Sequence, residues 1–416
     1  MKKRVLSLVL VMGLLVGMFA GCGSSSSSDS DSASTELTLW MAPMASSDGE
    51  LTDEEYWTEK TAAFAEEHDC TIKVEIIPWD SYEEKYLTGV TSDDGPDVGW
   101  LYMEMFYDYI DMGALVDIDE YFTEEDKANY LYYDLGNILG GQYALPFIVG
   151  NPRVLLANVD ILEQAGVAEI PTTWDEFLVA CEAIKTNCDG VAPIVQDWGN
   201  PHYGSLNEIY WPYFWSAGGE IVDEDGNLTI DSEAGLEATQ FLYDLKANGY
   251  LSDTCTSIDD VRVPFQNGEA AFIYCATGNA LKLEGVNWDY VTALAGPEDA
   301  ETFVAADSLV MFESCENKEL AAELMKYLTS TEVMSDYHKT ITDQPPITVD
   351  EEYTGDERFA TVFEEDADLL RSLPVFKGAS SMYDTLFKNL QAMMLGDMTP
   401  EEVLTKTSEY YETNLK

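Results

Sequence analysis

Short alternating runs of apolar residues and longer amphipathic stretches follow one another along the first half of the chain. Ile72, Val74 and Ile76 alternate with polar residues, as in a half-buried strand. Thr52 and Glu55 form a capping box at the start of an amphipathic stretch, which predicts a helix. The predicted elements are strands at 36–41, 72–76 and 98–102 and helices at 52–68 and 82–88. This strand and helix alternation indicates a parallel, helix-covered sheet.

The same alternation returns after Pro146. Asn158 caps a short helix that ends at Gly166, and Thr173 with Glu176 forms a second capping box. Residues 220–230 predict a β-hairpin. Further strands are expected at 154–157, 192–196, 270–274 and 304–312, and helices at 173–187, 261–266, after Asn317, and over 347–416 with a Thr399 cap. The pattern therefore predicts an α/β fold of two lobes, with a chain that crosses between them more than once.

The first residues have the pattern of an export signal. Lys2, Lys3 and Arg4 precede an apolar run over 5–19 that is too short to span a bilayer. The ending 19–22 resembles the bacterial lipobox, although Phe19 stands where leucine is usual, and the resemblance implies diacylation of Cys22. A plain cleaved signal peptide is the alternative. We expect a lipoprotein signal peptide over 1–21 and a flexible, serine-rich tether over 22–35.

Charge excludes several classes of partner. The 21 Lys and Arg residues face 78 Asp and Glu residues, which gives a formal net charge of −57. Nucleic acid and anionic lipid both require a cationic surface, so we expect neither as a partner of the folded part. The hydrophobic fraction of 46% is that of a folded protein. Self-repulsion favours a monomer, and the net charge favours neutral or cationic ligands.

Cysteine and histidine spacing predicts no metal site. The chain has three histidines and no CxxC or zinc-type spacing, so we expect neither a metal nor another cofactor. Asp223, Asp225 and Asn227 suggest a calcium loop, but Leu228 stands where that loop requires glycine. Six cysteines follow Cys22, and export permits disulfides without requiring them. Cys181 and Cys188 are the pair that the spacing favours most.

Catalytic motifs are absent from the sequence. No GxGxxG, GxxxxGK[ST], HExxH or GxSxG pattern occurs. Asp197, Glu208 and Asp307 could supply a glycosidase pair, but close carboxylates arise by chance among 78 acids. An exported α/β protein without a nucleophile, base or metal signature is expected to bind a ligand and not to be an enzyme.

Aromatic residues gather after predicted strands. Trp40 ends the first strand, Trp79 follows the second, and Tyr102 follows the third. Trp198 lies in a loop, and Trp211 lies in the aromatic run 210–215. Ligands of open α/β sheets bind at the carboxyl ends of strands, and flat aromatic faces beside Asp, Glu and Asn suit sugars. Core packing is the alternative for each tryptophan; the loop neighbours of Trp79, Trp198 and Trp211 favour a cleft.

Eight ordered segments resemble those of the family 1 extracellular solute-binding proteins of ABC importers, the maltose-binding-protein group. The resemblance covers the chain from residue 36 to its C-terminus. Each segment is short, but their order agrees with the family. They are Ile72-Lys73-Val74, Gly95-Pro96-Asp97-Val98, residues 113–118, residues 141–146, residues 158–166, Pro171-Thr172-Thr173-Trp174-Asp175-Glu176, residues 265–271 and residues 317–321.

The resemblance implies a periplasmic-binding-protein-like fold, in which two α/β lobes are joined by a three-segment hinge and close on a ligand. The implied lobes are 36–148 plus 295–341 and 152–293 plus 347–416, with crossings at 149–152, 293–297 and 342–346. Together with the aromatic and carboxylate candidates, it gives the ligand-binding set Trp40, Met44, Trp79, Tyr102, Glu104, Asn151, Arg153, Asp197, Trp198, Glu208, Trp211, Asp307 and Tyr383. Leu101 and the segment 276–278 depart from the family pattern, which makes maltose a poor candidate.

We therefore expect a lipid-anchored binding protein on the extracellular face of the bacterial membrane. It would capture a carbohydrate, expected to be an oligosaccharide, and deliver it to the permease of an ABC importer. A non-sugar solute, such as a glycerophosphodiester, polyamine or osmolyte, is the alternative, and a secreted carbohydrate-active enzyme is a further one. Arg153 could pair with an anionic ligand or neutralise nearby carboxylates.

Overall fold

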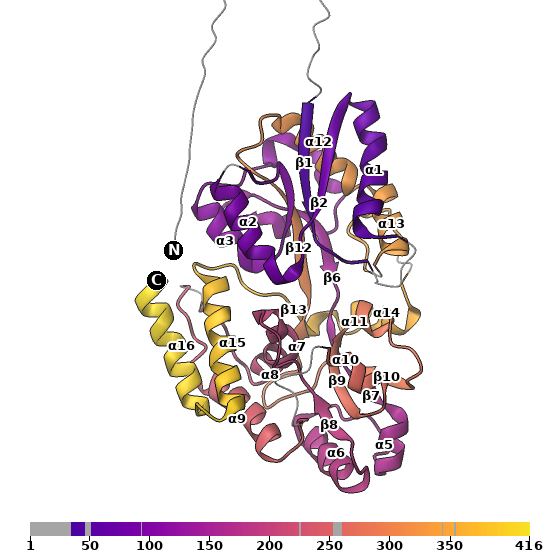
Figure 1. Ribbon diagram of the computed structural model, residues 1–416, viewed down its shortest axis with the longest axis vertical. Helices are drawn as coiled ribbons and strands as arrows, with labels where there is room; N and C mark the ends of the chain where they lie inside the picture. The colour runs from indigo at the N-terminus through magenta and orange to yellow at the C-terminus, as the bar shows by residue number, and fades with distance from the viewer. Residues whose placement is uncertain are drawn as a thin grey trace, which may run out of the picture. The chain divides into compact units, whose positions relative to one another are not determined.

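The computed structural model describes residues 35–45, 51–92, 94–223, 226–252, 260–342, 344–352 and 355–416. Two large β-sheets organise these residues (Figure 1). The first has the strand order β2-β1-β3-β12-β6 and the second has the order β10-β7-β9-β8. The signal peptide, Cys22, most of the tether, Asp225 and Cys255 lie outside the described residues.

The strand bounds agree with most of the predicted runs. The first sheet contains β1 (Thr35–Met41), β2 (Cys70–Ile76), β3 (Val98–Leu101), β6 (Leu145–Gly150) and β12 (Ala305–Met311). The second contains β7 (Arg153–Asn158), β8 (Ala192–Val195), β9 (Ala270–Ala276) and β10 (Trp288–Val291). Short pairs join β4 (Asn137–Ile138) to β5 (Gly141–Gln142) and β11 (Thr302–Phe303) to β13 (Leu370–Arg371).

Both sheets are mixed, so the expectation of a parallel sheet is only partly confirmed. β1 runs parallel to β2 and β3, but β12 lies antiparallel between β3 and β6. β12 pairs Ser308 with Leu101, so more than 200 residues of chain separate the two partners. Local hydrophobic patterns carry no information about the direction of so distant a partner, and this is why the prediction failed there.

Helices cover the sheets. Around the first lie α1 (Asp53–Glu67), α2 (Tyr82–Thr91), α3 (Met103–Asp111), α4 (Glu124–Ala128), α12 (Lys318–Leu328) and α13 (Thr331–Thr340). Around the second lie α5 (Val159–Ala165), α6 (Trp174–Asn187), α7 (Leu206–Ile209), α8 (Trp211–Ser216), α9 (Glu233–Ala247), α10 (Arg262–Gln266), α11 (Thr277–Ala280), α14 (Ala360–Glu364), α15 (Ala379–Leu395) and α16 (Pro400–Asn414). Short 3-10 turns occupy Trp79–Ser81, Asp119–Tyr121, Tyr133–Gly136, Tyr203–Ser205, Glu357–Phe359 and Ala367–Leu369.

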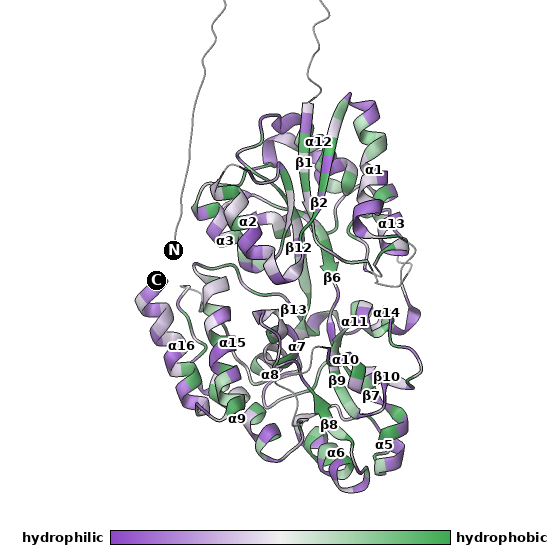
Figure 2. Cartoon of the chain, in the orientation of Figure 1, coloured by the Kyte–Doolittle hydropathy of each residue, from purple (hydrophilic) through white to green (hydrophobic). Residues whose placement is uncertain are grey.

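The central strands of the second sheet are buried on both faces. Leu155 and Ala157 of β7 pack into one core cluster, and Val154 and Leu156 pack into another on the opposite face. Side chains alternate across a strand, so a run that is apolar at every position fits a strand covered by helices on both sides. Figure 2 shows hydrophobic colour also along β8, the edge strand of this sheet, against the mixed colours of α16.

The predicted helix caps are confirmed. Thr52 and Glu55 form a reciprocal capping box, as do Thr399 and Glu402. Asn158 caps α5, which ends at Gly166 in the left-handed conformation that glycine adopts without a steric penalty. The Thr173 side chain caps α6, but the Glu176 carboxylate accepts from Thr172 instead of completing the box with Thr173. Local side-chain chemistry therefore fixed these helix starts.

Two predicted elements differ in the structure. The hairpin expected over 220–230 is reduced, in its described residues, to one isolated antiparallel bridge between Val222 and Leu228. The stretch after 347 is not continuously helical, because Leu370 and Arg371 form β13 beside β11. That pairing is a contact with residues about 70 positions earlier, which a local helical period cannot reveal.

Cys181 and Cys188 are free thiols, so the pairing that their spacing favoured is wrong. Both lie at α6, where seven residues correspond to roughly 10 Å along the axis. A disulfide requires the two Cα atoms to lie within about 7 Å. The thiols are buried, and burial raises the pKa of Cys188 and that of Cys181.

The chain first crosses from one sheet to the other between Gly150 and Arg153. β6 ends at Gly150 and β7 begins at Arg153, with Asn151 held at a positive φ of 52° between them. Gly150 lies against Pro345 of a second crossing, and a Cβ atom added at Gly150 would approach the proline Cδ to 2.4 Å. Leu294 and Phe303 still pack with the second sheet, whereas β12 belongs to the first. Two of the crossings are thus in direct contact.

Candidate ligand-binding site

A cavity of about 510 Å³ lies between residues of the two sheets. Trp79, Tyr102, Glu104 and Asp307 line it from the first sheet and its helices. Arg153, Glu208 and Asn279 line it from the second. A neighbouring cavity of about 410 Å³ shares Met44, Trp79, Asn151, Arg153, Arg262, Ala276 and Asn279 with the first, so the two form one continuous site.

Strand ends supply most of the lining residues. Met44 follows β1, Tyr102 follows β3, Gln196 follows β8 and Asn279 follows β9. The carboxyl ends of neighbouring parallel strands meet at one edge of a sheet, where the chain turns and leaves side chains free to face a ligand. The cavity therefore lies at the strand ends where the site was predicted, but only Trp79 and Tyr102 of the five aromatic residues named for it line the cavity.

Nine of the thirteen predicted site residues line the cavity: Met44, Trp79, Tyr102, Glu104, Asn151, Arg153, Asp197, Glu208 and Asp307. The other four, Trp40, Trp198, Trp211 and Tyr383, do not line it and are buried in the cores. Trp40 packs edge-on against Tyr86, and Trp198 stacks on Phe387 and donates to Gln196 Oε1 at 3.0 Å.

The cleft placement of Trp211 is the clearest error. Its side chain is 1% exposed and lies edge-on to Tyr383, with ring centroids 5.3 Å apart. The aromatic run 210–215 forms the end of α7 and the short helix α8, whose residues are buried on every side. An aromatic run in a buried helix resembles an aromatic run in a cleft when only the sequence is known.

Trp79, which is half-buried, and Tyr102 form the aromatic wall of the cavity. Trp79 stacks on Tyr82 with centroids 4.9 Å apart, and its indole nitrogen donates to the Pro43 carbonyl at 3.2 Å. These contacts hold the indole in one orientation while its remaining surface faces the cavity. A fixed aromatic face of this kind binds the apolar C–H face of a ring without losing rotamer freedom on binding.

Two buried carboxyl groups, those of Glu104 and Asp307, line the cavity on the same side as this wall. Burial raises the pKa of Glu104 to about 8, and the nearby Asp307 and Glu83 carboxylates add to the shift. Burial also raises the pKa of Asp307, to about 7. Each group therefore retains a substantial protonated fraction near neutral pH. A protonated carboxyl donates and accepts hydrogen bonds, as a ligand hydroxyl does.

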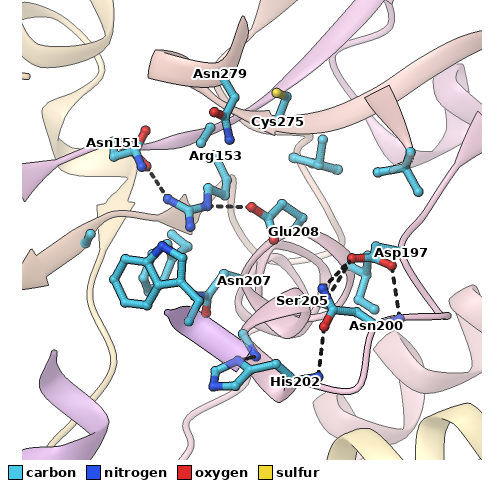
Figure 3. A pocket seen from close by; sticks show the side chains of 18 of the residues that line it. Asn151, Arg153, Asp197, Asn200, His202, Ser205, Asn207, Glu208, Cys275 and Asn279 are labelled. Carbon is cyan, nitrogen blue, oxygen red and sulfur yellow. Dashed lines mark hydrogen bonds and ion pairs between the residues drawn. The ribbon is translucent and has the colours of Figure 1, made fainter. Parts of the chain in front are cut away.

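Arg153 neutralises the third carboxylate. Its Nε donates to Glu208 Oε1 at 2.8 Å and its Nη1 to the Asn151 carbonyl at 2.6 Å (Figure 3). The guanidinium also lies 4.9 Å from the centre of the Phe303 ring. Burial raises the pKa of Glu208, and the Arg153 charge opposes that shift. Of the two roles predicted for Arg153, the structure shows neutralisation of a carboxylate.

The Asp197 carboxylate is occupied by hydrogen bonds within its own loop. Its carboxylate accepts from the Asn200 side chain at 3.0 Å and from Ser205 Oγ at 3.1 Å (Figure 3). Further along, His202 Nδ1 accepts from the Gly204 amide at 2.9 Å, and burial lowers the pKa of this histidine. The loop therefore forms a rigid floor, and Asp197 has less capacity left for a ligand than Glu104.

Glu83 connects the two sides of the cavity. Its carboxylate accepts from Tyr102 Oη at 2.8 Å on the first side and from Tyr203 Oη on the second. Ser380 of α15 also donates to the Glu104 carbonyl at 3.0 Å. These bonds hold the two sides together near the aromatic wall.

Several lining residues were not predicted, among them Asn207, Asp260, Arg262, Asn279 and Phe303. Asn279 follows β9, so its position at a strand end was a usable signal. Arg262 belongs to the sparse set of cations, which was another. Phe303 left no signal, because its place depends on the distant pairing of β11 with β13.

The described residues contain neither a cluster of metal-binding side chains nor a helix able to span a membrane. No group of three or more His, Cys, Asp or Glu side chains there could hold a metal ion. Among the same residues, no helix is both long and apolar enough to cross a membrane.

Comparisons with known proteins agree with this architecture. The family model of bacterial extracellular solute-binding proteins matches residues 48–335. A relative from Brucella abortus, named only as a binding protein, is 26% identical over 385 residues, which cover 87% of this chain and 90% of the relative. The diacetylchitobiose binding protein DasA of Streptomyces coelicolor is 25% identical over 362 residues, which cover 79% of each chain.

A solved structure shares the fold. It is the ABC substrate-binding protein Lmo0181 of Listeria monocytogenes in complex with cycloalternan, which matches with a TM-score of 0.77 and 20% identity over 91% of this chain and 99% of that one. The match covers both sheets of this chain, so the predicted periplasmic-binding-protein fold is confirmed. The family is non-enzymatic, as the sequence predicted. The chain therefore belongs to the bacterial extracellular solute-binding proteins, the ligand-capturing components of ABC importers.

Proposed function

We propose that this protein captures an oligosaccharide in the cavity between its lobes and delivers it to the permease of an ABC importer. The observation that carries the proposal is that the fixed Trp79 face and the partly protonated Glu104 and Asp307 carboxyls line the same cavity. An aromatic face fits the C–H side of a sugar ring, and groups that both donate and accept fit its hydroxyl rim. One relative is named a diacetylchitobiose binding protein, and one solved structure of the same fold is a complex with cycloalternan. Both support this class of ligand.

We propose further that the lobes close on the ligand about the three crossings. In this proposal the lobes meet at Asn151, between Phe303 and β12, and at the 342–346 segment, close to the boundaries expected from sequence. The bonds from Tyr102 and Tyr203 to Glu83 would then belong to the closed form. A ligand that touches both sides favours that form by its differential affinity.

The test is a titration of the purified chain with neutral di- to tetrasaccharides, followed by tryptophan fluorescence and calorimetry. At least one saccharide is expected to bind and to change the tryptophan emission. Spermidine and glycerophosphocholine serve as the non-sugar arms. Binding of either one without binding of any saccharide would overturn the proposal.

Trp79→Ala should weaken binding of that saccharide by about 10- to 100-fold, because the variant loses one stacking platform worth roughly 1–3 kcal/mol. Calorimetry measures the change. Trp288→Ala is the matched control, since Trp288 stacks on Phe359 and lies outside both cavities. Equal losses in the two variants would show that the effect is on the fold and not on stacking.

We also propose that Cys22 carries the lipid anchor that the lipobox resemblance implies. Cys22→Ser should release the protein from the cell into the medium, because the modified thiol is the attachment point. Radiolabelled palmitate incorporation and fractionation measure this. A variant that still takes up label and stays with the membrane would contradict the proposal.

A further inference from the structure

The smaller of the two cavities has the opposite charge to the rest of the protein. Arg153, Arg262 and Lys282 line it, and no Asp or Glu is among the described residues that do so. Acids outnumber cations almost fourfold along the chain, so three cations around one cavity are a local reversal. The cavity also offers the donors of Asn151, Asn279, Thr342 and Gln344.

Two of these cations already have partners. Arg153 pairs with Glu208, and Arg262 pairs with Asp260 through Nε at 2.9 Å and Nη2 at 2.7 Å. Arg262 Nη1 and Arg153 Nη2 donate to none of the described residues. The ion pairs therefore offset the charge of the two arginines but leave each of them one nitrogen that can donate to a ligand.

Lys282 is different, because its ammonium group has no ion pair or hydrogen bond with any of the residues that the structure describes. Burial and the neighbouring Arg262 lower the pKa of Lys282. The negative charge of Asp53 raises the pKa of Lys282 and so opposes this shift. Asp53, however, is only 7% exposed, and its carboxylate already accepts from the Met44 and Ala45 amides at 3.0 Å. A cation without a partner gains more from a bound anion than a paired one does.

We infer that the bound saccharide carries an anionic substituent, which lies in the smaller cavity beside Lys282 and Arg262. This inference rests on the proposed function and names the ligand as an acidic oligosaccharide. The sugar rings occupy the larger cavity against Trp79, and the shared residues Asn151, Arg153 and Asn279 connect the two parts. The charge of the whole chain disfavours an anion at long range, but it is screened within about 10 Å in salt, whereas the Lys282 contact is local.

The experiment compares saccharides that differ only in charge. Trigalacturonate is titrated against its full methyl ester, and a sulfated disaccharide of carrageenan against its desulfated form. The acidic member of at least one pair should bind about tenfold more tightly, as expected for one charge-assisted contact. Which pair shows the preference distinguishes a carboxylate from a sulfate. Acidic members that bind no more tightly than their neutral counterparts would overturn the inference.

Variants at Lys282 assign the preference to this cavity. Lys282 is exposed at the rim of the smaller cavity, so Lys282→Met is expected to fold normally and to abolish the tenfold preference. Lys282→Glu should reverse the preference. Lys388→Met, at an exposed pair with Asp384, is the control and should behave as the unmodified chain.

The outcomes separate the two proposals. Neutral saccharides that bind without any charge preference would leave the proposed function intact and refute the acidic ligand. A preference that survives both Lys282 variants would also refute this site. If no member of any pair or of the neutral panel binds, both proposals fail.

Discussion

At pH 8 the Glu104→Gln variant should be more stable toward urea than the unmodified chain by roughly 3–5 kcal/mol, and at pH 4 the two should be nearly equal. The cause is the burial of the Glu104 carboxyl, whose side chain is almost inaccessible and whose pKa is raised to about 8. Arg153 and the residue's own backbone amide oppose this shift without cancelling it. Glutamine has nearly the same shape and carries no charge to bury.

The direction of the pH dependence follows from proton binding. Between roughly pH 4.5 and 8 the folded chain retains a proton on Glu104 that the unfolded chain has lost, so stability falls as the pH rises through this window. Above the window both states are ionised and the penalty is complete. Below it both are protonated and the penalty is absent.

Urea denaturation at several pH values measures the difference between the two chains. Glu409→Gln, on the exposed face of α16, is the control and should show no such trend. A stability difference for Glu104→Gln that does not change between pH 4 and 8 would show that Glu104 has the same pKa in the folded and the unfolded chain, which would contradict the raised pKa. The same variant tests the site, since glutamine can still donate to and accept from a sugar hydroxyl.

Arg153→Met should lower the free energy of unfolding at pH 7 by about 2–4 kcal/mol. Removing one partner of a buried ion pair costs about 3–5 kcal/mol, because the other charge stays buried and unpaired. The expected loss is slightly smaller here, since the Glu208 side chain keeps 26% of its exposure. The Asn151 carbonyl also loses its Nη1 donor, at the first crossing between the sheets.

Arg358→Met is a closely matched control. Arg358 also donates to an aspartate, Asp356, and lies 4.4 Å from the centre of the Trp288 ring, as Arg153 lies over Phe303. Its side chain is 52% exposed, so the expected loss is about 0–1 kcal/mol. Glu208→Gln in the Arg153→Met background should recover part of the loss. If Glu208→Gln recovers none of the lost stability, the loss comes from the Phe303 and Asn151 contacts and not from the unpaired Glu208 charge.

Features that depend on neighbouring residues were predictable from the sequence. The helix caps at Thr52, Asn158 and Thr399 could be predicted because each side chain accepts a hydrogen bond from the backbone amide three residues later. Tyr102 was found because it follows a predicted strand, and the family resemblance pointed to both Tyr102 and Glu104. For these residues, local chemistry and fold class together were sufficient.

Features that depend on pairing between distant segments could not be predicted from the sequence. The antiparallel position of β12, the β11 and β13 pair, and Phe303 with it, arise from contacts between chain segments far apart in sequence. Trp211 was misplaced for a related reason: α9 and α15 pack against the helices beside it and remove it from the cavity side. Aromatic content alone cannot distinguish a residue covered by such helices from one that faces a ligand.

The crystal structure of the chain with the saccharide of highest affinity in the titration panel tests the binding site most directly. The sugar should lie between the two sheets, with one ring stacked on Trp79 and a hydroxyl within hydrogen-bond distance of Glu104 or Asp307. A saccharide bound elsewhere, with the cavity beside Trp79 occupied by water, would contradict the site and the proposed function built on it.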